Sequence, residues 1–361
     1  MKSNSRALNF EDVFSDQTKN YMKLDSQKYL DIGNIPIIDQ GNNIIAGYAN
    51  IEIDKTYDFD PVIVFGDHTR RFKYIDFPFC LGADGAKVLK PKNKADTKYL
   101  FHYLCSLDIE NNGYSRHFKF LKRKEFILPP LAEQKRIAEI LDKANEIKAK
   151  RELALAKLDE LAMSMFEELC EKDKMKKNIK IENLVIKNKL IDTDKEEVWN
   201  LTLDQIDSNG GEINGFLQVN RSEVGSSTYY FKPPVVLYSK LRPYLNKVVM
   251  PEIDGYATTE LVPLYCNEEL ISPVFLLNYL RSKKFVEFAN INSGGAKMPR
   301  VMMDKFWKHE IKLPSKVTQH KFDLIYDQIK AQKSILKNNL TTHNLLFNSL
   351  QHEAFTTGFN A

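Results

Sequence analysis

The apolar positions that follow Leu128 repeat with the spacing of a long α-helix. Residues three and four positions apart form one stripe, interrupted once by a charged side chain, as in the seam of a coiled coil. The stripe comprises Ile137, Ile140, Ala144, Ile147, Arg151, Ala154, Leu158, Leu161 and Met165. Pro129 and Pro130 end the preceding extended segment, and Pro130 suits the first position of a helix. The pattern therefore predicts a helix that runs to about Leu169.

The same pattern occurs again near the end of the chain. Leu313-Pro314-Ser315 repeats Leu128-Pro129-Pro130, and Gln319 follows Leu313 at the distance at which Gln134 follows Leu128. The second stripe keeps the phase of the first but is more polar, since it includes Gln332, Asn339 and His343. It predicts a second long helix over roughly Thr318 to Phe355.

The segments upstream of the two helices also resemble each other. Tyr99–Ser106 parallels Phe275–Ser282, and we expect a helix at each of these places. Pro61–Phe65 parallels Pro234–Tyr238, where we expect apolar strands at Val62–Phe65 and Val235–Tyr238, and the second copy has extra residues. A repeat of this length determines the architecture. We therefore expect an α+β protein made of two tandem copies, each a mixed domain followed by a long helix. The expected boundaries are 1–129 and 130–172 for the first copy, and 173–314 and 315–361 for the second.

Composition adds little about partners but indicates a compartment. The 361 residues are 43% hydrophobic and 28% charged, with a net charge of +4, which is too small to identify a partner. The four cysteines are scattered, with no metal-binding or secreted-framework spacing. We find no signal peptide and no apolar run of the roughly 18 residues that a membrane span needs. The cytosol is the expected location.

The sequence offers no catalytic motif that we could identify. It lacks a phosphate-binding loop, a zinc-protease helix motif and the paired motifs of an amino-methyltransferase. Gly82-Ala-Asp-Gly85 is too short for a dinucleotide fingerprint and suits a turn between strands. Glu133-Gln-Lys135 lies in a helix start with no partner motif of a nuclease. The histidines show no metal-ligand spacing, so no metal site is expected.

Basic loops with interspersed aromatic residues recur at equivalent places in both copies. Such side chains can neutralise phosphates and reach base edges, although a solvated surface is the alternative for any one of them. One set is His68, Arg70, Arg71 and Lys73 in the first copy, with Lys240, Arg242 and Tyr244 in the second. The other set is Arg116, His117 and Lys119, with Lys297 and Arg300 as counterparts.

The entry Leu128-Pro-Pro-Leu-Ala-Glu-Gln-Lys-Arg-Ile-Ala-Glu-Ile-Leu141, in a duplicated unit, resembles the specificity subunits of type I restriction–modification systems. Val64–Tyr74 together with Leu81–Lys87 is similar to one class of first recognition domain in that family, which adds Lys87 to the candidate DNA contacts. The resemblance implies two target recognition domains, separated by two long helices that form an antiparallel coiled coil. It implies a non-catalytic chain that recognises a bipartite, asymmetric sequence in double-stranded DNA.

The resemblance also implies partners and cofactors outside this chain. DNA methyltransferase subunits would dock on the helices, and a restriction and translocation subunit would join them. S-adenosylmethionine, ATP and Mg²⁺ would then belong to those partners. The candidate docking residues are Ile137, Leu141, Leu155, Leu169, Phe322, Ile329 and Leu346. Two alternatives remain: a fused methyltransferase or nuclease with its own recognition module, and a helical scaffold that does not bind DNA.

Overall fold

The computed structural model describes residues 7–52, 60–82, 85–92, 95–110, 113, 115–186, 193–209 and 211–356. Its contacts divide the chain into two compact units: Met1–Arg151 with Asn339–Ala361, and Glu152–Asn338. Both boundaries fall inside the long helices α4 (Leu131–Lys172) and α9 (Lys316–Thr356), so each helix contributes to both units. The two helices occur where the apolar pattern predicts them, and each extends slightly beyond the predicted bounds.

Among its described residues, the first unit contains two small sheets and one strand pair. Its four-stranded antiparallel sheet has the order β2 (Phe14–Asp16), β8 (Ala86–Pro91), β5 (Val62–Gly66) and β6 (Phe72–Ile75). The second sheet consists of β4 (Gly47–Ala49), β3 (Ile35–Ile38) and β7 (Cys80–Leu81), with β3 parallel to β7, and β1 (Leu8–Asn9) pairs with β9 (Glu125–Phe126). β5 is buried along its whole length, as its unbroken apolar run predicts.

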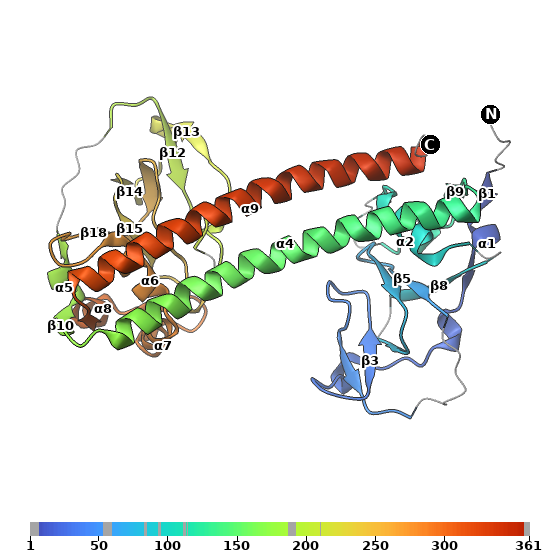
Figure 1. Ribbon diagram of the computed structural model, residues 1–361, viewed down its shortest axis with the longest axis horizontal. Helices are drawn as coiled ribbons and strands as arrows, with labels where there is room; N and C mark the ends of the chain where they lie inside the picture. Colours follow the sequence, from blue (N-terminus) through green and yellow to red (C-terminus); the bar gives the residue numbers. More distant parts are fainter. Residues whose placement is uncertain are drawn as a thin grey trace. The chain divides into compact units, whose positions relative to one another are not determined.

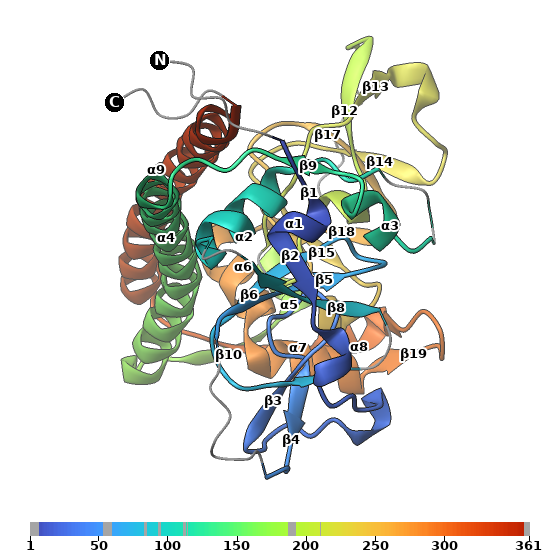
Figure 2. The same ribbon diagram turned by 90° about the vertical axis from the view of Figure 1, so that its right-hand side faces the viewer.

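Short helices cover the first unit's sheet and connect it to the long helices. They are α1 (Phe10–Val13), α2 (Thr97–Ser106) and α3 (Phe118–Leu121), with 3₁₀ turns at Thr18–Asn20 and Ser26–Lys28. Tyr99 and Leu100 of α2 pack with Ile137 and Leu141 of α4, and Ala354 of α9 completes this core. Figure 2 shows α2 lying between α4 and the strands. Ala83 and Asp84 of the predicted Gly82–Gly85 turn lie outside the described residues.

The second unit repeats this architecture (Figure 1). One sheet is β11 (Val185–Ile186), β18 (Leu261–Cys266), β15 (Val236–Ser239) and β16 (Val248–Val249), and the other is β13 (Gln218–Asn220), β12 (Glu197–Leu201), β17 (Gly255–Thr258) and β14 (Thr228–Phe231). The strand pairs are β10 (Lys177–Lys180) with β21 (Glu310–Leu313), and β19 (Ser293–Gly294) with β20 (Arg300–Val301). The helices are α5 (Ile181–Leu184), α6 (Pro273–Arg281), α7 (Lys283–Ile291) and α8 (Met303–Lys308), with 3₁₀ turns at Leu203–Gln205, Arg221–Glu223 and Pro243–Leu245.

The strand order confirms the duplication that the sequence indicates. The sheet β2-β8-β5-β6 corresponds to β11-β18-β15-β16, and the parallel pair β3 and β7 corresponds to β12 and β17. α2 corresponds to α6 at the predicted place. α7 follows α6 in the second unit, where the second copy is longer. The fold is therefore α+β, as expected.

The two long helices pack against each other within each unit. In the second unit the rings of Phe166 (α4) and Phe322 (α9) lie 5.1 Å apart. In the first unit Arg151 Nη1 donates to the carbonyl of Asn339 over 3.3 Å. The first part of α4 and the last part of α9 belong to the same unit, so the helices run antiparallel.

The glutamine in the repeated helix entry connects each long helix to its mixed domain. Gln134 is 5% exposed; its Oε1 accepts from the Asp96 N–H over 2.9 Å, and its Nε2 donates to the Pro129 carbonyl over 2.8 Å. Gln319 makes the same pair of bonds, to the Ser272 N–H and the Pro314 carbonyl, each over 3.0 Å. Asp96 and Ser272 are the N-caps of α2 and α6. The glutamine therefore fixes the start of one helix against the start of another.

Candidate nucleic-acid interface

In the first unit, hydrogen bonds join the two predicted basic segments. The loop after β5 begins at Asp67, whose carbonyl accepts from His117 N over 3.0 Å and from His117 Nδ1 over 2.9 Å. The Asp67 carboxylate accepts from the Phe118 N–H over 2.7 Å. Asp67 and His117 are both buried. Residues 67–71 and 115–119 therefore form one structural element, which we call the first paired loop.

Several cations of the first paired loop reach solvent. Arg71, Arg116 and Lys119 are exposed. Lys87, on the neighbouring strand β8, is partly exposed, and its Nζ lies 5.4 Å from the centre of the Phe118 ring. Positive charges in this arrangement can follow a phosphate backbone.

Two other side chains of this loop are partly buried. Arg70 Nη1 donates to the Ile109 carbonyl over 2.9 Å. The His68 backbone N–H donates to Gln40 Oε1 over 3.2 Å. Both residues are partly exposed, so they remain candidates for DNA contact while also supporting the loop.

The structure removes Lys73 and His117 from the set of candidate DNA contacts. Lys73 is 7% exposed, and its Nζ donates to the carbonyls of Asp39, over 2.7 Å, and Asn43, over 2.5 Å. Burial lowers the pKa of Lys73 despite the Asp39 carboxylate nearby. The His117 ring is enclosed, and its Nε2 has no hydrogen-bond partner among the described residues. Both side chains position loops and cannot reach a ligand in this conformation.

In the second unit the two predicted segments are joined in the same way. The Lys240 carbonyl accepts from the Val301 N–H over 2.9 Å, and the Arg242 N–H donates to the Pro299 carbonyl over 2.7 Å. Leu241 and Arg300 also form a β-bridge. Residues 240–244 and 295–300 therefore form a second paired loop, which the sequence analysis located without predicting this contact.

The second paired loop also presents cations and an aromatic ring. Tyr244 is 51% exposed, Lys297 is exposed, and Lys240 is partly exposed. Arg242 is partly exposed, and its Nε is a buried donor with no partner among the described residues. A buried, unpaired donor is unfavourable unless a ligand satisfies it.

An arginine occupies the left-handed region in the turn that follows the central strand of each unit. Arg70 has φ of 59°, four residues after the end of β5, and Arg242 has φ of 50°, three residues after the end of β15. This conformation is uncommon for residues other than glycine, and it concentrates at functional sites.

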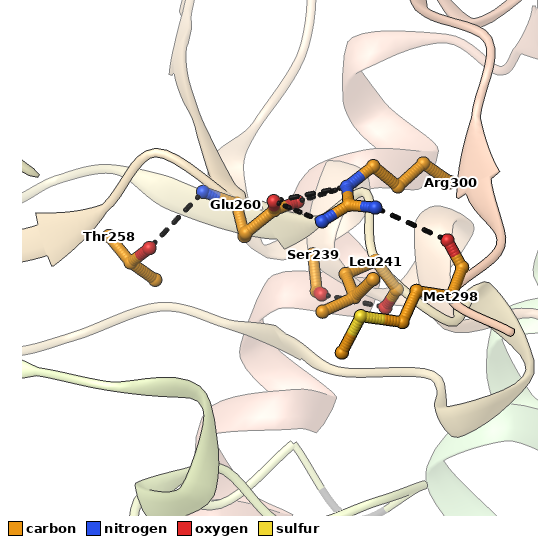
Figure 3. Close-up of polar contacts among 6 residues, drawn as sticks. All are labelled: Ser239, Leu241, Thr258, Glu260, Met298 and Arg300. Carbon is orange, nitrogen blue, oxygen red and sulfur yellow. Dashed lines mark hydrogen bonds and ion pairs between the residues drawn. The ribbon is translucent and has the colours of Figure 1, made fainter. Parts of the chain in front are cut away.

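Arg300 is held by an acid that the sequence analysis did not identify (Figure 3). Its Nε and Nη2 donate to the Glu260 carboxylate over 3.0 Å and 2.8 Å, and its Nη1 donates to the Met298 carbonyl over 3.3 Å. The hydrogen bond to Glu260 raises the pKa of Arg300. Glu260 is 40 positions away in the chain, so no local pattern connects it with Arg300.

The predicted docking residues on the long helices need a correction. Ile137, Leu141, Phe322 and Ile329 are between 0% and 7% exposed because they form the cores of their own units, so they cannot receive a partner. Leu155 and Leu169 are partly buried. Only Leu346 of the predicted set is well exposed, at 56%.

Within the described residues, no cluster of histidine, cysteine, aspartate or glutamate could hold a metal ion. The helices in those same ranges include none that is both long and apolar enough to cross a membrane.

Comparisons with known proteins agree with the sequence resemblance. Residues 5–157 match the family model of the type I restriction modification DNA specificity domain. The EcoDI specificity subunit of Escherichia coli is 24% identical over 159 residues, which are 43% of this chain and 35% of that protein. The EcoR124I/EcoR124II specificity subunit of Escherichia coli is 30% identical over 138 residues, 34% of each protein. The matches thus span about a third of the length of these relatives.

Solved structures match over nearly the whole chain. The S subunit of a type I restriction-modification system from M. genitalium aligns with a TM-score of 0.53 and 17% identity, covering 98% of both chains. A chain from a structure of type I R-M complex assembly and conformational transition gives the same TM-score and coverage at 14% identity. These likenesses show a shared fold.

Proposed function

We propose that this chain, which belongs to the type I restriction–modification DNA specificity family, is the subunit that recognises DNA for such a system. The observation that carries this proposal is the recurrence of a paired loop with exposed cations at the same place in both units. Arginine and lysine on loops can bind phosphates and can donate to base edges in the major groove. The chain itself is non-catalytic in this role.

We assign 1–129 and 173–314 as the two target recognition domains, and 130–172 and 315–361 as the helices that connect them. Residues 67–71 and 240–244 differ in sequence, with an acidic first residue in one and a basic first residue in the other. Because different side chains select different base edges, the two halves of the target should differ. We therefore propose a bipartite, asymmetric site in double-stranded DNA.

Methyltransferase subunits are the proposed partners of the helices. Val317, Leu324 and Ile335 of α9 are between 53% and 66% exposed. Their spacings of seven and eleven residues place them on one helix face. Exposed aliphatic side chains aligned on one helix face can pack into the apolar surface of a partner helix. A restriction and translocation subunit would complete the assembly, with S-adenosylmethionine, ATP and Mg²⁺ bound by the partners, in the cytosol.

The test is selection of bound DNA from a pool of random duplexes. The full chain is purified with the adenine methyltransferase subunit from its own genome, and the bound sequences are determined. Two different conserved blocks separated by unselected bases are expected. A pool without enrichment at low and moderate salt would favour the scaffold alternative, and modification or cleavage of DNA by the chain alone would favour the enzyme alternative.

Arg242→Ala sharpens this test. If Arg242 contacts a base, the variant should lose about 1–3 kcal/mol at one block only. If it contacts a phosphate, affinity should fall for all sequences, and the dependence on salt should decrease by about one counterion. Unchanged binding would remove Arg242 from the interface.

A further inference from the structure

The two paired loops contain an arginine at the same structural position. In the first unit the His117 N–H donates to the carbonyl of Asp67, the first residue of the turn, and Arg116 directly precedes His117. In the second unit the Val301 N–H donates to the carbonyl of Lys240, and Arg300 directly precedes Val301. The N–H of that first residue also has matching bonds in the two units. Asp67 donates to the Gly85 carbonyl over 2.6 Å, and Lys240 donates to the Glu260 carbonyl over 3.0 Å. Gly85 and Glu260 therefore occupy equivalent positions.

In the second unit this position supplies a carboxylate to the arginine. Figure 3 shows both Glu260 oxygens facing the Arg300 guanidinium, which approaches from the β20 strand. The Glu260 N–H donates to Thr258 Oγ1 over 3.4 Å, and its carbonyl accepts from Lys240, so the backbone that carries the acid is held on both sides. The Glu260 side chain is 23% exposed and that of Arg300 is 45% exposed.

In the first unit the equivalent residue is a glycine in a backbone conformation that side chains rarely adopt. Gly85 has φ of 101°, and a Cβ added there would lie 2.6 Å from Gln40 Oε1. Arg116 is exposed, and no carboxylate among the described residues pairs with its guanidinium. The arginine at this position is thus held by a carboxylate in the second unit, whereas in the first unit it is exposed and has no such partner among the described residues.

The fixed guanidinium keeps a pair of donors for a ligand. Arginine carries five N–H donors. Nε, one N–H of Nη2 and one N–H of Nη1 meet Glu260 or Met298, which leaves one N–H on each terminal nitrogen. Two parallel donors match the O6 and N7 acceptors of guanine in the major groove. Because Glu260 also cancels the charge of Arg300, the pair is poorly suited to a contact that depends on neutralising phosphate.

We propose that Glu260 is a specificity-determining residue, which holds Arg300 so that its two remaining donors meet the edge of a guanine, whereas Arg116 contacts phosphate. This inference rests on the proposed function in DNA recognition. The second recognition domain would then select a guanine through Arg300. The first domain would select no base through Arg116, the equivalent arginine.

The experiment compares Glu260→Gln, Arg300→Lys and Arg116→Ala in the full chain bound to its methyltransferase subunit, with the random duplex pool as probe. Arg300→Lys keeps the charge but loses the fixed pair of donors, and it should lose about tenfold of the preference for guanine at one position. Glu260→Gln should lose the same preference while its affinity for unrelated duplexes rises and its salt dependence steepens by about one counterion. Arg116→Ala should lower affinity evenly and make the salt dependence shallower.

The double variant Glu260→Gln/Arg300→Lys should be no worse in base preference than Arg300→Lys alone, since Glu260 acts through Arg300. An unchanged base preference in Glu260→Gln would overturn the inference. A loss of affinity that is equal for all sequences, with the preference for guanine intact, would overturn it too, because a purely structural residue would give that result. Thermal unfolding and co-elution with the methyltransferase show that each variant is folded. If the wild-type complex enriches no sequence at all, the proposed function fails instead, and that result is visible before any variant is made.

Discussion

At the residue scale, contacts from distant parts of the chain determine which cations of the paired loops reach solvent. Arg71 and Lys73 are two positions apart, yet Arg71 is exposed and Lys73 is buried under residues 39–43. The contact that buries Lys73 comes from a loop about thirty positions upstream, as the Arg300 contact comes from Glu260. Composition identifies candidate cations, whereas long-range contacts decide which of them can meet DNA.

Replacing Lys73 and Arg71 should separate stability from binding. Lys73→Met leaves two carbonyls and the Asp39 carboxylate without their buried donor, so it should cost about 2–4 kcal/mol of local stability. Arg71→Met should change stability by less than about 0.5 kcal/mol. Hydrogen exchange of the β5 amides measures this, because both tryptophans, Trp199 and Trp307, belong to the second unit.

DNA binding should respond in the opposite order. Arg71→Met should reduce the salt dependence of binding by about one counterion, and the folded fraction of Lys73→Met should keep the wild-type dependence. A change in salt dependence for Lys73→Met alone would return Lys73 to the interface.

At the element scale, sequence periodicity predicted most of the architecture. The two long helices appear where the apolar pattern places them, because each spans many turns of a regular apolar spacing. The strands β5 and β15 appear there because each is a short run of residues that is buried throughout. The hydrogen bonds of Gln134 and Gln319 could not be foreseen. They connect each glutamine to the cap of a helix that begins more than 35 positions earlier.

Removing these glutamines should loosen each mixed domain from its helix. Gln319→Ala leaves a buried N–H and a buried carbonyl without partners, at a cost of about 2 kcal/mol or more. Gln134→Ala does the same to a partly buried N–H and carbonyl, so it should cost less, about 1–2 kcal/mol. Gln319→Ala can be followed by urea unfolding of tryptophan fluorescence, and Gln134→Ala by hydrogen exchange of α2. Gln328→Ala, an exposed glutamine on α9, is the matched control and should change stability by less than about 0.5 kcal/mol. Equal effects at Gln319 and Gln328 would show that only helix propensity had changed.

At the scale of the whole molecule, the two compact units do not coincide with the two sequence copies. The first unit includes the last residues of the chain because the antiparallel helices bring the end of α9 beside the beginning of α4. An apolar seam predicts that a helix has a partner, but it does not distinguish a helix of the same chain from another subunit. This is why Ile137, Leu141, Phe322 and Ile329 were predicted as docking residues and are core residues instead.

The exposed row on α9 provides the corrected docking test. Leu324→Lys with Ile335→Lys places two charges on the proposed methyltransferase interface while keeping residues compatible with a helix. Burial of unpaired charges in an interface costs several kcal/mol, so binding of the methyltransferase should weaken at least thirtyfold, by about 2 kcal/mol or more. Ser334→Lys is the control, since Ser334 is exposed on the same helix and lies about 100° around the helix axis from Ile335. Sedimentation or titration calorimetry measures the affinity, and circular dichroism shows whether the helices persist. If the double variant binds as tightly as the Ser334→Lys control, the partner uses another face of the helices, and the row at Val317, Leu324 and Ile335 is not the docking surface.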